Sequence, residues 1–334
     1  MPRTSKPADL VLSGGGVKGV GLVGAVVALL EAGYVPQRVS GTSAGSIVGA
    51  VVAAAAQAGQ LTGAQVKELA LQLDYRKFLD PGAFERVPVI GPSVALARHN
   101  GIYKGDYAHN WVRAQLAGLG ITTFGDLAID DDELPPEQRY RLVVTVSDVT
   151  TGQLVRLPWD YRRVYGLDPD EQSVADAVRA SMSIPFFFRP VTLESAAGLT
   201  STLMDGGLLS NFPIDSLDRH DGRTPRWPSF GVTVLPNLPQ GNDRVIPGLD
   251  VLRLVGAPHA LEDVITTVLV GRDQAYLNQP WVSARAIRVD STKVGFLDFD
   301  ISDADVEALY AKGHVAGQEF LSTWNWAEYK RRYR

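Results

Sequence analysis

Short apolar runs alternate with longer apolar segments in the first part of the chain. Residues 9–13 are a brief apolar run that ends at three glycines, which is typical of a strand that stops at a loop. Residues 17–33 are apolar nearly all round, as in a helix that is buried on most sides. A second strand near 38–40 and a second apolar helix over 46–57 follow. This order predicts a βαβ unit and therefore a parallel sheet covered by helices.

The rest of the chain continues the alternation less regularly, with no internal repeat and no long linker. We therefore expect one α/β domain over residues 8–320. Its further elements are predicted as helices near 65–73, 106–116, 174–181, 261–277 and 303–321, and as strands near 141–146, 200–204, 230–235 and 286–289.

Composition narrows the class of protein. The 334 residues are 45% hydrophobic and 21% charged, which suits a sizeable core, and the net charge of −5 argues against a nucleic-acid partner. Because there is no cysteine, disulfides, thiolate metal sites and a cysteine nucleophile are excluded. The N-terminus lacks the apolar core of a signal peptide. The uncharged stretch 39–66 is rich in alanine and broken by glycines, a poor match to a membrane span, so we expect a cytoplasmic protein.

A candidate nucleophile lies between the second strand and the second helix. Gly41-Thr42-Ser43-Ala44-Gly45 matches the G-x-S-x-G elbow in the strand-to-helix context that gives this motif meaning. The flanking glycines Gly41 and Gly45 remove side chains that would clash in a sharp turn. The turn would lift the hydroxyl of Ser43 to the carboxyl edge of the sheet, at the positive end of a helix.

The glycine run 14–19 (GGGVKG) also follows a strand and precedes a helix. It fits a dinucleotide-binding fingerprint, but that motif needs an acidic residue at the end of the second strand, where the serine elbow stands instead. The other interpretation is a set of unblocked backbone N–H groups that bind an anion, which beside a reactive serine is an oxyanion hole. Lys18 adds positive potential there, or is simply a solvated lysine of the first helical turn.

A serine needs a base, and the five histidines do not follow predicted core strands. Asp205 does end such a strand, so its carboxylate should stand at the same sheet edge as Ser43, with Gly206 and Gly207 allowing a tight turn. Burial raises the pKa of an aspartate toward a value useful for a base. A Ser-His-Asp triad remains the alternative, with His220, His259 or His314 in the right order, although Ser43 comes early for the fold that carries such a triad.

Together these motifs resemble the patatin-like phospholipase family. The resemblance rests on GGGVKG, GTSAG and Asp-Gly-Gly at 205–207, and it is supported by 180–185 (ASMSIP), 211–213 (NFP) and 101–103 (GIY). It covers residues 8–215 with specific motifs and is looser from there to about 320. The resemblance implies a three-layer α/β sandwich in which a mostly parallel central sheet has helices on both faces.

The resemblance also implies chemistry: hydrolysis of phospholipid or related lipid esters through an acyl-enzyme, with neither metal nor organic cofactor. Ser43 would be the nucleophile and Asp205 its base, without histidine. The implied oxyanion donors are Gly14, Gly15, Gly16 and Val17, and the implied supporting residues are Lys18, Gly19, Gly41, Gly45, Gly206 and Gly207. Transacylation and a non-catalytic lipid-binding or regulatory role are the alternatives.

Three segments carry further expectations. Residues 75–104, which combine Gly/Pro breaks with apolar side chains, are predicted to form a mobile lid. Residues 180–188 read as core packing, with the phenylalanines 186–188 as an acyl-pocket wall in the alternative interpretation. The tail 321–334 interleaves aromatic and basic residues, which suits peripheral contact with a membrane, but a frayed terminus is the favoured interpretation.

Overall fold

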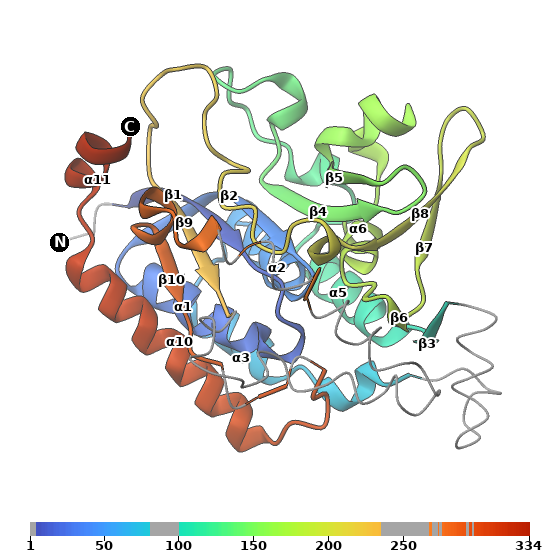
Figure 1. The fold of residues 1–334 in the computed structure, drawn as a ribbon, viewed down its shortest axis with the longest axis horizontal. Helices are drawn as coiled ribbons and strands as arrows, with labels where there is room; N and C mark the ends of the chain where they lie inside the picture. The colour runs from blue at the N-terminus through green and yellow to red at the C-terminus, as the bar shows by residue number, and fades with distance from the viewer. Residues whose placement is uncertain are drawn as a thin grey trace.

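The first four elements build the predicted βαβ unit. Strand β1 (Lys6–Leu12) is followed by helix α1 (Gly19–Glu31), strand β2 (Tyr34–Thr42) and helix α2 (Ala44–Gln57). The two strands pair in parallel, which confirms the sequence prediction. Figure 1 shows both helices packed against these strands near the centre of the molecule.

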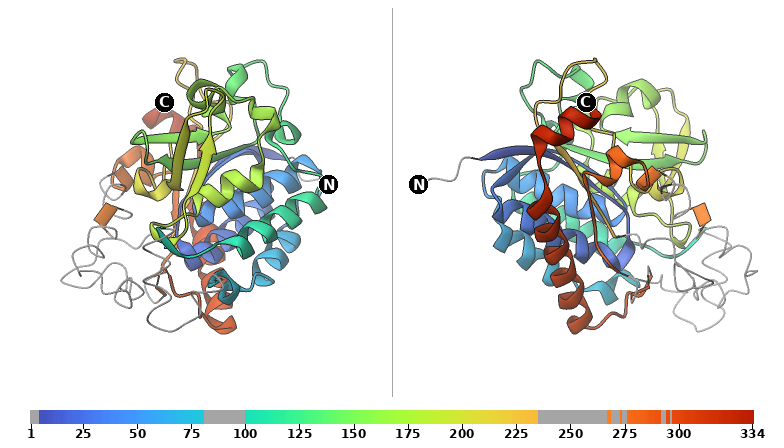
Figure 2. Two further views of the ribbon diagram at one scale, coloured as in Figure 1. Left: turned by 90° about the vertical axis from the view of Figure 1, so that its right-hand side faces the viewer. Right: turned by 60° about the vertical axis from the view of Figure 1, so that its left-hand side comes forward.

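A computed structural model describes residues 5–80, 100–234 and most of 267–334, with 269–272, 274, 275, 292, 293 and 296 left out of the last range. In these residues the central sheet has the strand order β10-β9-β1-β2-β4-β8-β7, and β5 pairs with β4 outside this path. β10, β9, β1, β2 and β4 run parallel, whereas β5 and β8 pair with β4 antiparallel. The expected mostly parallel sheet is therefore confirmed (Figure 2).

The remaining elements follow the predicted order with additions. The further helices are α3 (Gly63–Leu71), α5 (Asp106–Gly118), α6 (Val174–Ser181), α9 (Pro280–Ser283), α10 (Asp303–Thr323) and α11 (Trp326–Tyr333). The further strands are β3 (Gly101–Tyr103), β4 (Leu142–Asp148), β5 (Gln153–Leu157), β6 (Phe186–Phe188), β7 (Val191–Glu194), β8 (Thr200–Asp205), β9 (Ser229–Thr233) and β10 (Ala286–Arg288). Strands β3, β5, β6 and β7 and helices α9 and α11 were not predicted from the sequence pattern, and the predicted helix near 261–277 lies largely outside the described residues.

Alternation along the strands divides the core between the two faces of the sheet. Leu10 and Leu12 belong to the large cluster that α1, α2 and α6 help to form, whereas Val11 packs with Phe212 and Val282 on the other face. Successive side chains of a strand point to opposite faces, so a fully apolar strand is buried on both. The long helices thus cover one face, and the other is covered by the packed segment around Phe212 and the short helix α9.

Strand β4 brings the two candidate catalytic segments together. β2 pairs with β4 as far as Thr42, which lies opposite Thr145, and β5 takes the other edge of β4. β8 pairs with β4 from the next residue, with Asp205 opposite Val146. Because a strand has only two edges, β8 occupies the edge that β2 leaves after Thr42. The end of β8 therefore meets the end of β2.

Helix α10 packs directly on α1 through two glycines. A Cβ atom at Gly24 would lie 2.0 Å from the carbonyl oxygen of Tyr310, and one at Gly313 would lie 1.9 Å from the carbonyl oxygen of Gly21. Real contacts of this kind do not occur, so both positions require glycine for the helices to approach this closely. This contact fixes α1, whose first turn carries the glycine loop.

The C-terminal residues form a packed helix, so the favoured interpretation of a frayed terminus was wrong. Tyr329 of α11 is buried, and its hydroxyl donates to the carbonyl oxygen of Trp281 at 3.1 Å. The guanidinium of Arg334 pairs with Asp218 at 2.5 Å. A terminus frays when nothing holds it, and here aromatic packing and an ion pair both do.

The packed tail lies at the amino edge of the sheet. Trp324, just before α11, packs edge-on against Phe230 near the start of β9, with ring centroids 5.1 Å apart. Figure 1 shows α11 beside the N-terminal end of β1. Any headgroup contact by α11 would therefore occur at the opposite sheet edge from Ser43.

Two expectations concern membranes and a lid. Among the helices of the described ranges, none combines the length and the apolar composition that crossing a bilayer requires. Of the predicted lid over 75–104, residues 81–99 lie outside the described residues. Its described start forms the short 3₁₀ helix η2 (Tyr75–Phe78), in which Phe78 is buried.

Candidate active site

Ser43 stands at a strained turn between β2 and α2. Its backbone has φ 52° and ψ −124°, a region that residues with side chains rarely adopt. A Cβ atom at Gly41 would lie 2.4 Å from the carbonyl oxygen of Gly45, and a Cβ atom at Gly45 would lie 2.4 Å from the carbonyl oxygen of Leu12. Both motif glycines are therefore required by close backbone contact. The turn holds Ser43 at the carboxyl edge of the sheet.

Asp205 lies directly beside Ser43, although 162 positions separate them in the chain. The Ser43 hydroxyl donates to Oδ2 of Asp205 at 2.6 Å, and the Gly207 N–H donates to Oδ1 at 2.8 Å. A Cβ atom at Gly206 would lie 2.3 Å from the carbonyl oxygen of Thr145, so this turn also needs glycine. The carboxylate is thereby fixed in both position and orientation.

Burial changes the acidity of Asp205. The residue is 1% exposed, and burial raises the pKa of its carboxyl from 3.8 to about 7, against the smaller opposing effects of hydrogen bonds from Ser43 and Gly207. A carboxylate with a pKa near the working pH both accepts and returns a proton readily. Asp205 is therefore equipped to serve as a base without histidine.

Ser181 is a site residue that the sequence patterns did not single out. Its hydroxyl oxygen accepts a hydrogen bond from the Ser43 N–H at 2.9 Å and donates to the carbonyl oxygen of Thr145 at 2.7 Å. It thus satisfies two buried backbone groups and links the strained turn to β4. The family-like segment ASMSIP contained Ser181, but the segment was interpreted as core packing. The available signal was a serine at the end of α6, among the apolar residues of the segment 180–188.

We expect Ser181→Ala to slow the reaction of Ser43 with a fluorophosphonate by about tenfold, because an unsatisfied buried N–H costs about 1–3 kcal/mol. Ser181→Thr, which keeps the hydroxyl, should restore most of the rate. The measurement is the second-order rate constant for covalent labelling, with the buried Ser229→Ala as a control. Wild-type labelling by Ser181→Ala, or no rescue by threonine, would contradict this positioning role.

The glycine loop lies next to Ser43 and presents free donors. Residues Gly16–Lys18 form the 3₁₀ helix η1, which leads into α1. Within the described ranges, the N–H groups of Gly15 and Gly16 have no hydrogen-bond acceptor, and Val17 follows them in the same turn. A Cβ atom at Gly19 would lie 3.0 Å from the Cβ of Ala44, so the loop and the elbow are closely packed.

Gly14 has a different role from the one expected. Its N–H donates to the carbonyl oxygen of Asn211 at 3.1 Å, and the Asn211 amide donates back to the Gly14 carbonyl at 3.4 Å. The expectation that Gly14 provides an oxyanion donor was therefore wrong, because its donor is already used. A Cβ atom at Gly14 would lie 2.1 Å from Oδ1 of Asn211 and 3.1 Å from the Cβ of Ser43. Gly14 instead anchors the loop.

Lys18 is buried and is not the solvated lysine of the alternative interpretation. Burial lowers the pKa of its ammonium to about 8, and the charge of Asp290 opposes this change. The positive charge therefore sits inside the protein beside the glycine loop, where it contributes to the local potential.

The described histidines are engaged elsewhere. The ring Nε2 of His109 lies 2.6 Å from Asp176, and that of His314 lies 2.7 Å from Glu31. His220 is exposed and lines a different cavity. His99 and His259 lie outside the described residues. Since the carboxylate of Asp205 contacts the Ser43 hydroxyl directly, no ring stands between them.

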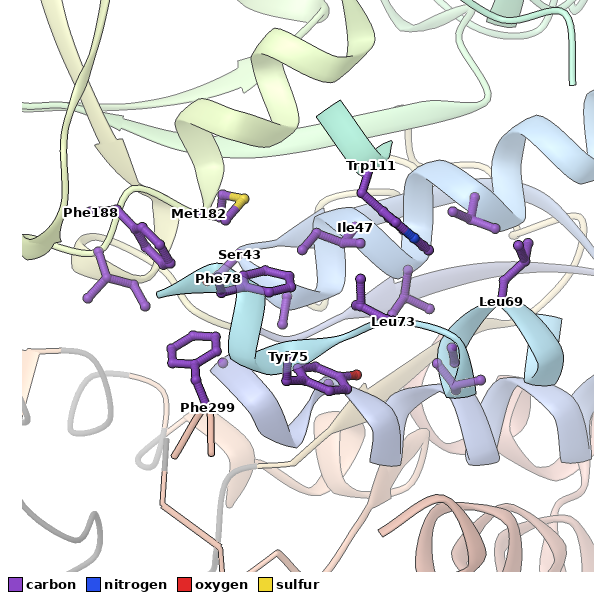
Figure 3. Close-up of a pocket in the computed structure, with 18 of the residues that line it drawn as sticks. Ser43, Ile47, Leu69, Leu73, Tyr75, Phe78, Trp111, Met182, Phe188 and Phe299 are labelled. Carbon is purple, nitrogen blue, oxygen red and sulfur yellow. The ribbon is translucent and has the colours of Figure 1, made fainter. Parts of the chain in front are cut away.

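An apolar cavity of about 710 Å³, including the part open to solvent, begins at Ser43. Ser43, Ile47 and Val51 follow one another at four-residue spacing along one face of α2, so this wall is about 12 Å long. Figure 3 shows Phe188 and Met182 near Ser43, and Leu69 farther along the cavity. Among the described residues that line the cavity, none carries a charge. The remaining lining side chains are those of Val23, Ala44, Val48, Val66, Ala70, Leu73, Tyr75, Phe78, Trp111, Ile184 and Phe299.

The phenylalanines of β6 contribute both to the core and to the lining of the cavity. Phe187 is a core residue that stacks on Phe299 with ring centroids 5.3 Å apart, and Phe188 lines the cavity while also being buried. Across the described residues, no group of three or more histidine, aspartate or glutamate side chains is arranged to hold a metal ion.

Comparison with known proteins identifies one matching family and several similar sequences. The sequence model of the patatin-like phospholipase family matches residues 10–218. YqhO of Bacillus subtilis is 40% identical over 229 residues, which are 68% of this chain and 71% of that protein. An NTE family protein of Mycobacterium tuberculosis is 29% identical over 314 residues, 90% of this chain and 44% of the relative. The chain thus spans less than half of the mycobacterial protein.

A solved structure shares the fold. VipD from Legionella pneumophila matches with a TM-score of 0.51 and 18% sequence identity, over 96% of this chain and 67% of that chain. At this identity the match concerns the arrangement of helices and strands alone.

Proposed function

The chain belongs to the patatin-like phospholipase family, a family of lipid hydrolases, and we propose that it releases fatty acid from phospholipid or a related lipid ester through an acyl-enzyme on Ser43. The observation that carries this proposal is the 2.6 Å hydrogen bond from the Ser43 hydroxyl to Asp205 at one end of an apolar cavity.

The first step forms the acyl-enzyme. Oγ of Ser43 attacks the ester carbonyl carbon while its proton passes to Oδ2 of Asp205, and the carbonyl oxygen becomes an oxyanion. The free N–H groups of Gly15 and Gly16, with that of Val17, would bind this oxyanion, and each such donor is worth about 2.7–4 kcal/mol in the transition state. The bond to the leaving oxygen then breaks, and that oxygen takes the proton from Asp205.

The second step returns the enzyme to its starting state. Water attacks the acyl carbon and gives a proton to Asp205, and the same N–H groups bind the second oxyanion. When the bond to Oγ breaks, Asp205 returns its proton to Ser43 and the fatty acid leaves. An Asp205 pKa of about 7 suits both directions of transfer. An alcohol in place of water would give transacylation.

The cavity supports a lipid acyl chain as the group that is transferred. Its wall is apolar along two turns of α2, and Phe78, Phe188 and Phe299 contribute large aromatic surfaces. Burial of each methylene in such a site is worth about 0.8 kcal/mol, so a longer chain gains affinity until the cavity is filled. A water-soluble ester with a short acyl group would leave most of this surface unused.

The test is release of fatty acid from a panel of phospholipids, glycerides and short esters. We expect kcat/KM for phospholipids of one headgroup to rise with acyl length and then level off, because the cavity has a fixed depth. Water and added alcohols are compared as acceptors to separate hydrolysis from transacylation. Absence of turnover on every ester, with lipid still bound, would instead favour the non-catalytic role.

A further inference from the structure

The apolar cavity starts at the serine elbow and extends along α2. Its lining residues Ile47 and Val51 lie four and eight residues after Ser43, which places them about 6 and 12 Å along the helix. Figure 3 shows Ile47 beyond Ser43, and Leu69 of α3 farther along the cavity. The distance from the candidate nucleophile can therefore be counted in turns of α2.

Helix α1 gives the same length and shows where the cavity closes. A Cβ atom at Gly19, its first residue, would lie 3.0 Å from the Cβ of Ala44, so α1 also starts beside the elbow. Val23 lines the cavity, whereas Val27, one turn farther, is not among its described lining residues. Instead, a Cβ atom at Gly63, the first residue of α3, would lie 3.1 Å from Cγ1 of Val27. Because α1 and α3 touch there, about 12 Å along α1 from Gly19, the cavity ends at this contact.

The closed end is formed by buried side chains of moderate size. Val51 of α2 is 5% exposed, and Val66, three residues after Gly63 on α3, is 3% exposed. Both line the cavity, and neither side chain carries a polar atom. Protein interiors are closely packed, so a chain that reaches these two valines can advance no farther without displacing them.

We propose that this closed end makes the enzyme selective for acyl chains of medium length, with Val51 and Val66 as the residues that set the limit. The inference rests on the proposed hydrolysis at Ser43 and specifies its substrates. An extended chain of single bonds advances about 1.2 Å per bond, so a length of about 12 Å holds about ten bonds beyond the carbonyl carbon. Methylenes within that length gain contact with the apolar wall, and methylenes beyond it do not.

A chain-length series of p-nitrophenyl esters tests the limit, from butanoyl to tetradecanoyl, each below the concentration at which it aggregates. We expect kcat/KM to rise about fourfold for each methylene added up to decanoyl, which is the contribution of one buried methylene. From dodecanoyl to tetradecanoyl it should change less than about twofold. An undiminished rise to tetradecanoyl overturns the proposal.

Binding of the matching fatty acids, from butanoate to tetradecanoate, measures the same limit without turnover. Their dissociation constants, obtained by calorimetry, should fall with chain length and level off at the same point as kcat/KM. Levelling in the absence of any ester turnover would overturn the proposed hydrolysis and support the length limit. Turnover without levelling in either series would overturn the length limit and leave the hydrolysis standing.

Two enlarged side chains test whether the positions along α2 act in order. An octanoyl chain extends about 8 Å, so it passes Ile47 but does not reach Val51. Ile47→Phe should therefore lower the octanoyl-to-butanoyl ratio of kcat/KM at least about tenfold. Val51→Phe should change that ratio less than about threefold and should instead lower the dodecanoyl-to-butanoyl ratio at least about tenfold. An equal loss on octanoyl in both variants contradicts the assignment.

Val51→Ala and Val52→Ala form a matched pair on one helix. Both valines are buried, but Val52 is not among the described residues that line the cavity. Val51→Ala enlarges the closed end, so the tetradecanoyl-to-decanoyl ratio of kcat/KM should rise at least about threefold. Val52→Ala removes the same atoms from the core and should leave this ratio unchanged. A general loss of folded enzyme does not alter a ratio between two substrates, and melting curves check that each variant folds. An equal change in both variants overturns the role of Val51.

Discussion

Ser43→Ala is expected to lower kcat for fatty acid release by at least about 10⁴-fold, because no acyl-enzyme can form without the hydroxyl. The fold should persist, since the Oγ of Ser43 has its hydrogen bond to Asp205 alone among the described residues and alanine keeps the Cβ atom. The measurement is steady-state hydrolysis of a phospholipid that the wild type accepts, together with covalent labelling by a fluorophosphonate. Labelling should disappear with activity.

The control for this variant is another buried serine. Ser201 of β8 is 8% exposed and carries no assigned role, so Ser201→Ala should keep both hydrolysis and labelling. Histidine replacements complete the comparison: His220→Ala and His314→Ala should each stay within a few-fold of wild type. Residual hydrolysis by Ser43→Ala within tenfold of wild type would mean that another residue is the nucleophile.

The serine elbow could be predicted from the sequence because the close contacts that require its glycines are mostly local. Gly41 and Gly45 are needed by contacts within the elbow and with the end of β1, so a five-residue pattern between a strand and a helix is informative. The prediction that Asp205 stands at the sheet edge of Ser43 used only the end of a strand. The structure brings these side chains together through the shared edge of β4, which no local pattern encodes.

Long-range contacts account for what sequence reasoning missed. The Gly14 N–H donates to the carbonyl oxygen of Asn211, 197 positions away in the chain. The number of glycines in the loop is therefore larger than the number of backbone N–H groups that are free to bind an oxyanion. Ser181 contacts Ser43 across 138 positions. β5 pairs with β4 and β7 pairs with β8, and both strands include exposed or half-buried polar side chains, so neither forms a continuous apolar run in the sequence. The tail was misjudged because its aromatic partners, such as Phe230, come from distant strands.

Asp205→Asn is expected to lower kcat/KM by about 10²–10⁴-fold, the usual contribution of a general base. Asparagine can keep the hydrogen bond from the Gly207 N–H and stay beside Ser43, so the loss should reflect proton transfer and not geometry. The wild type should lose activity as the pH falls through about 7, because protonated Asp205 cannot accept the serine proton. The residual activity of Asp205→Asn should not show this decrease as the pH falls through about 7.

The same substitution should stabilise the folded protein above pH 7. In the unfolded chain the Asp205 carboxyl ionises near 3.8, and in the folded protein near 7, so folding favours the protonated form. The contribution of Asp205 to the unfolding free energy is therefore most favourable below about pH 4, and up to about 4 kcal/mol of it is lost as the pH rises to about 7. Asparagine carries no charge at any pH, so Asp205→Asn avoids this loss.

Urea unfolding at pH 5 and pH 8 measures this difference. The unfolding free energy of Asp205→Asn relative to wild type should be higher at pH 8 than at pH 5 by about 2–3 kcal/mol, because from pH 5 to about pH 7 the carboxyl is ionised in the unfolded wild type but still largely protonated in the folded one. Asp221→Asn is the control, because Asp221 forms ion pairs with Arg219 and Arg223 and does not belong to the Ser43 site described above. If the unfolding free energy of Asp205→Asn relative to wild type is the same at pH 5 and pH 8, Asp205 is ionised throughout this pH range in the folded protein. Inactivity together with greater stability at pH 8 would show that the buried carboxylate is kept for its chemistry at the expense of the fold.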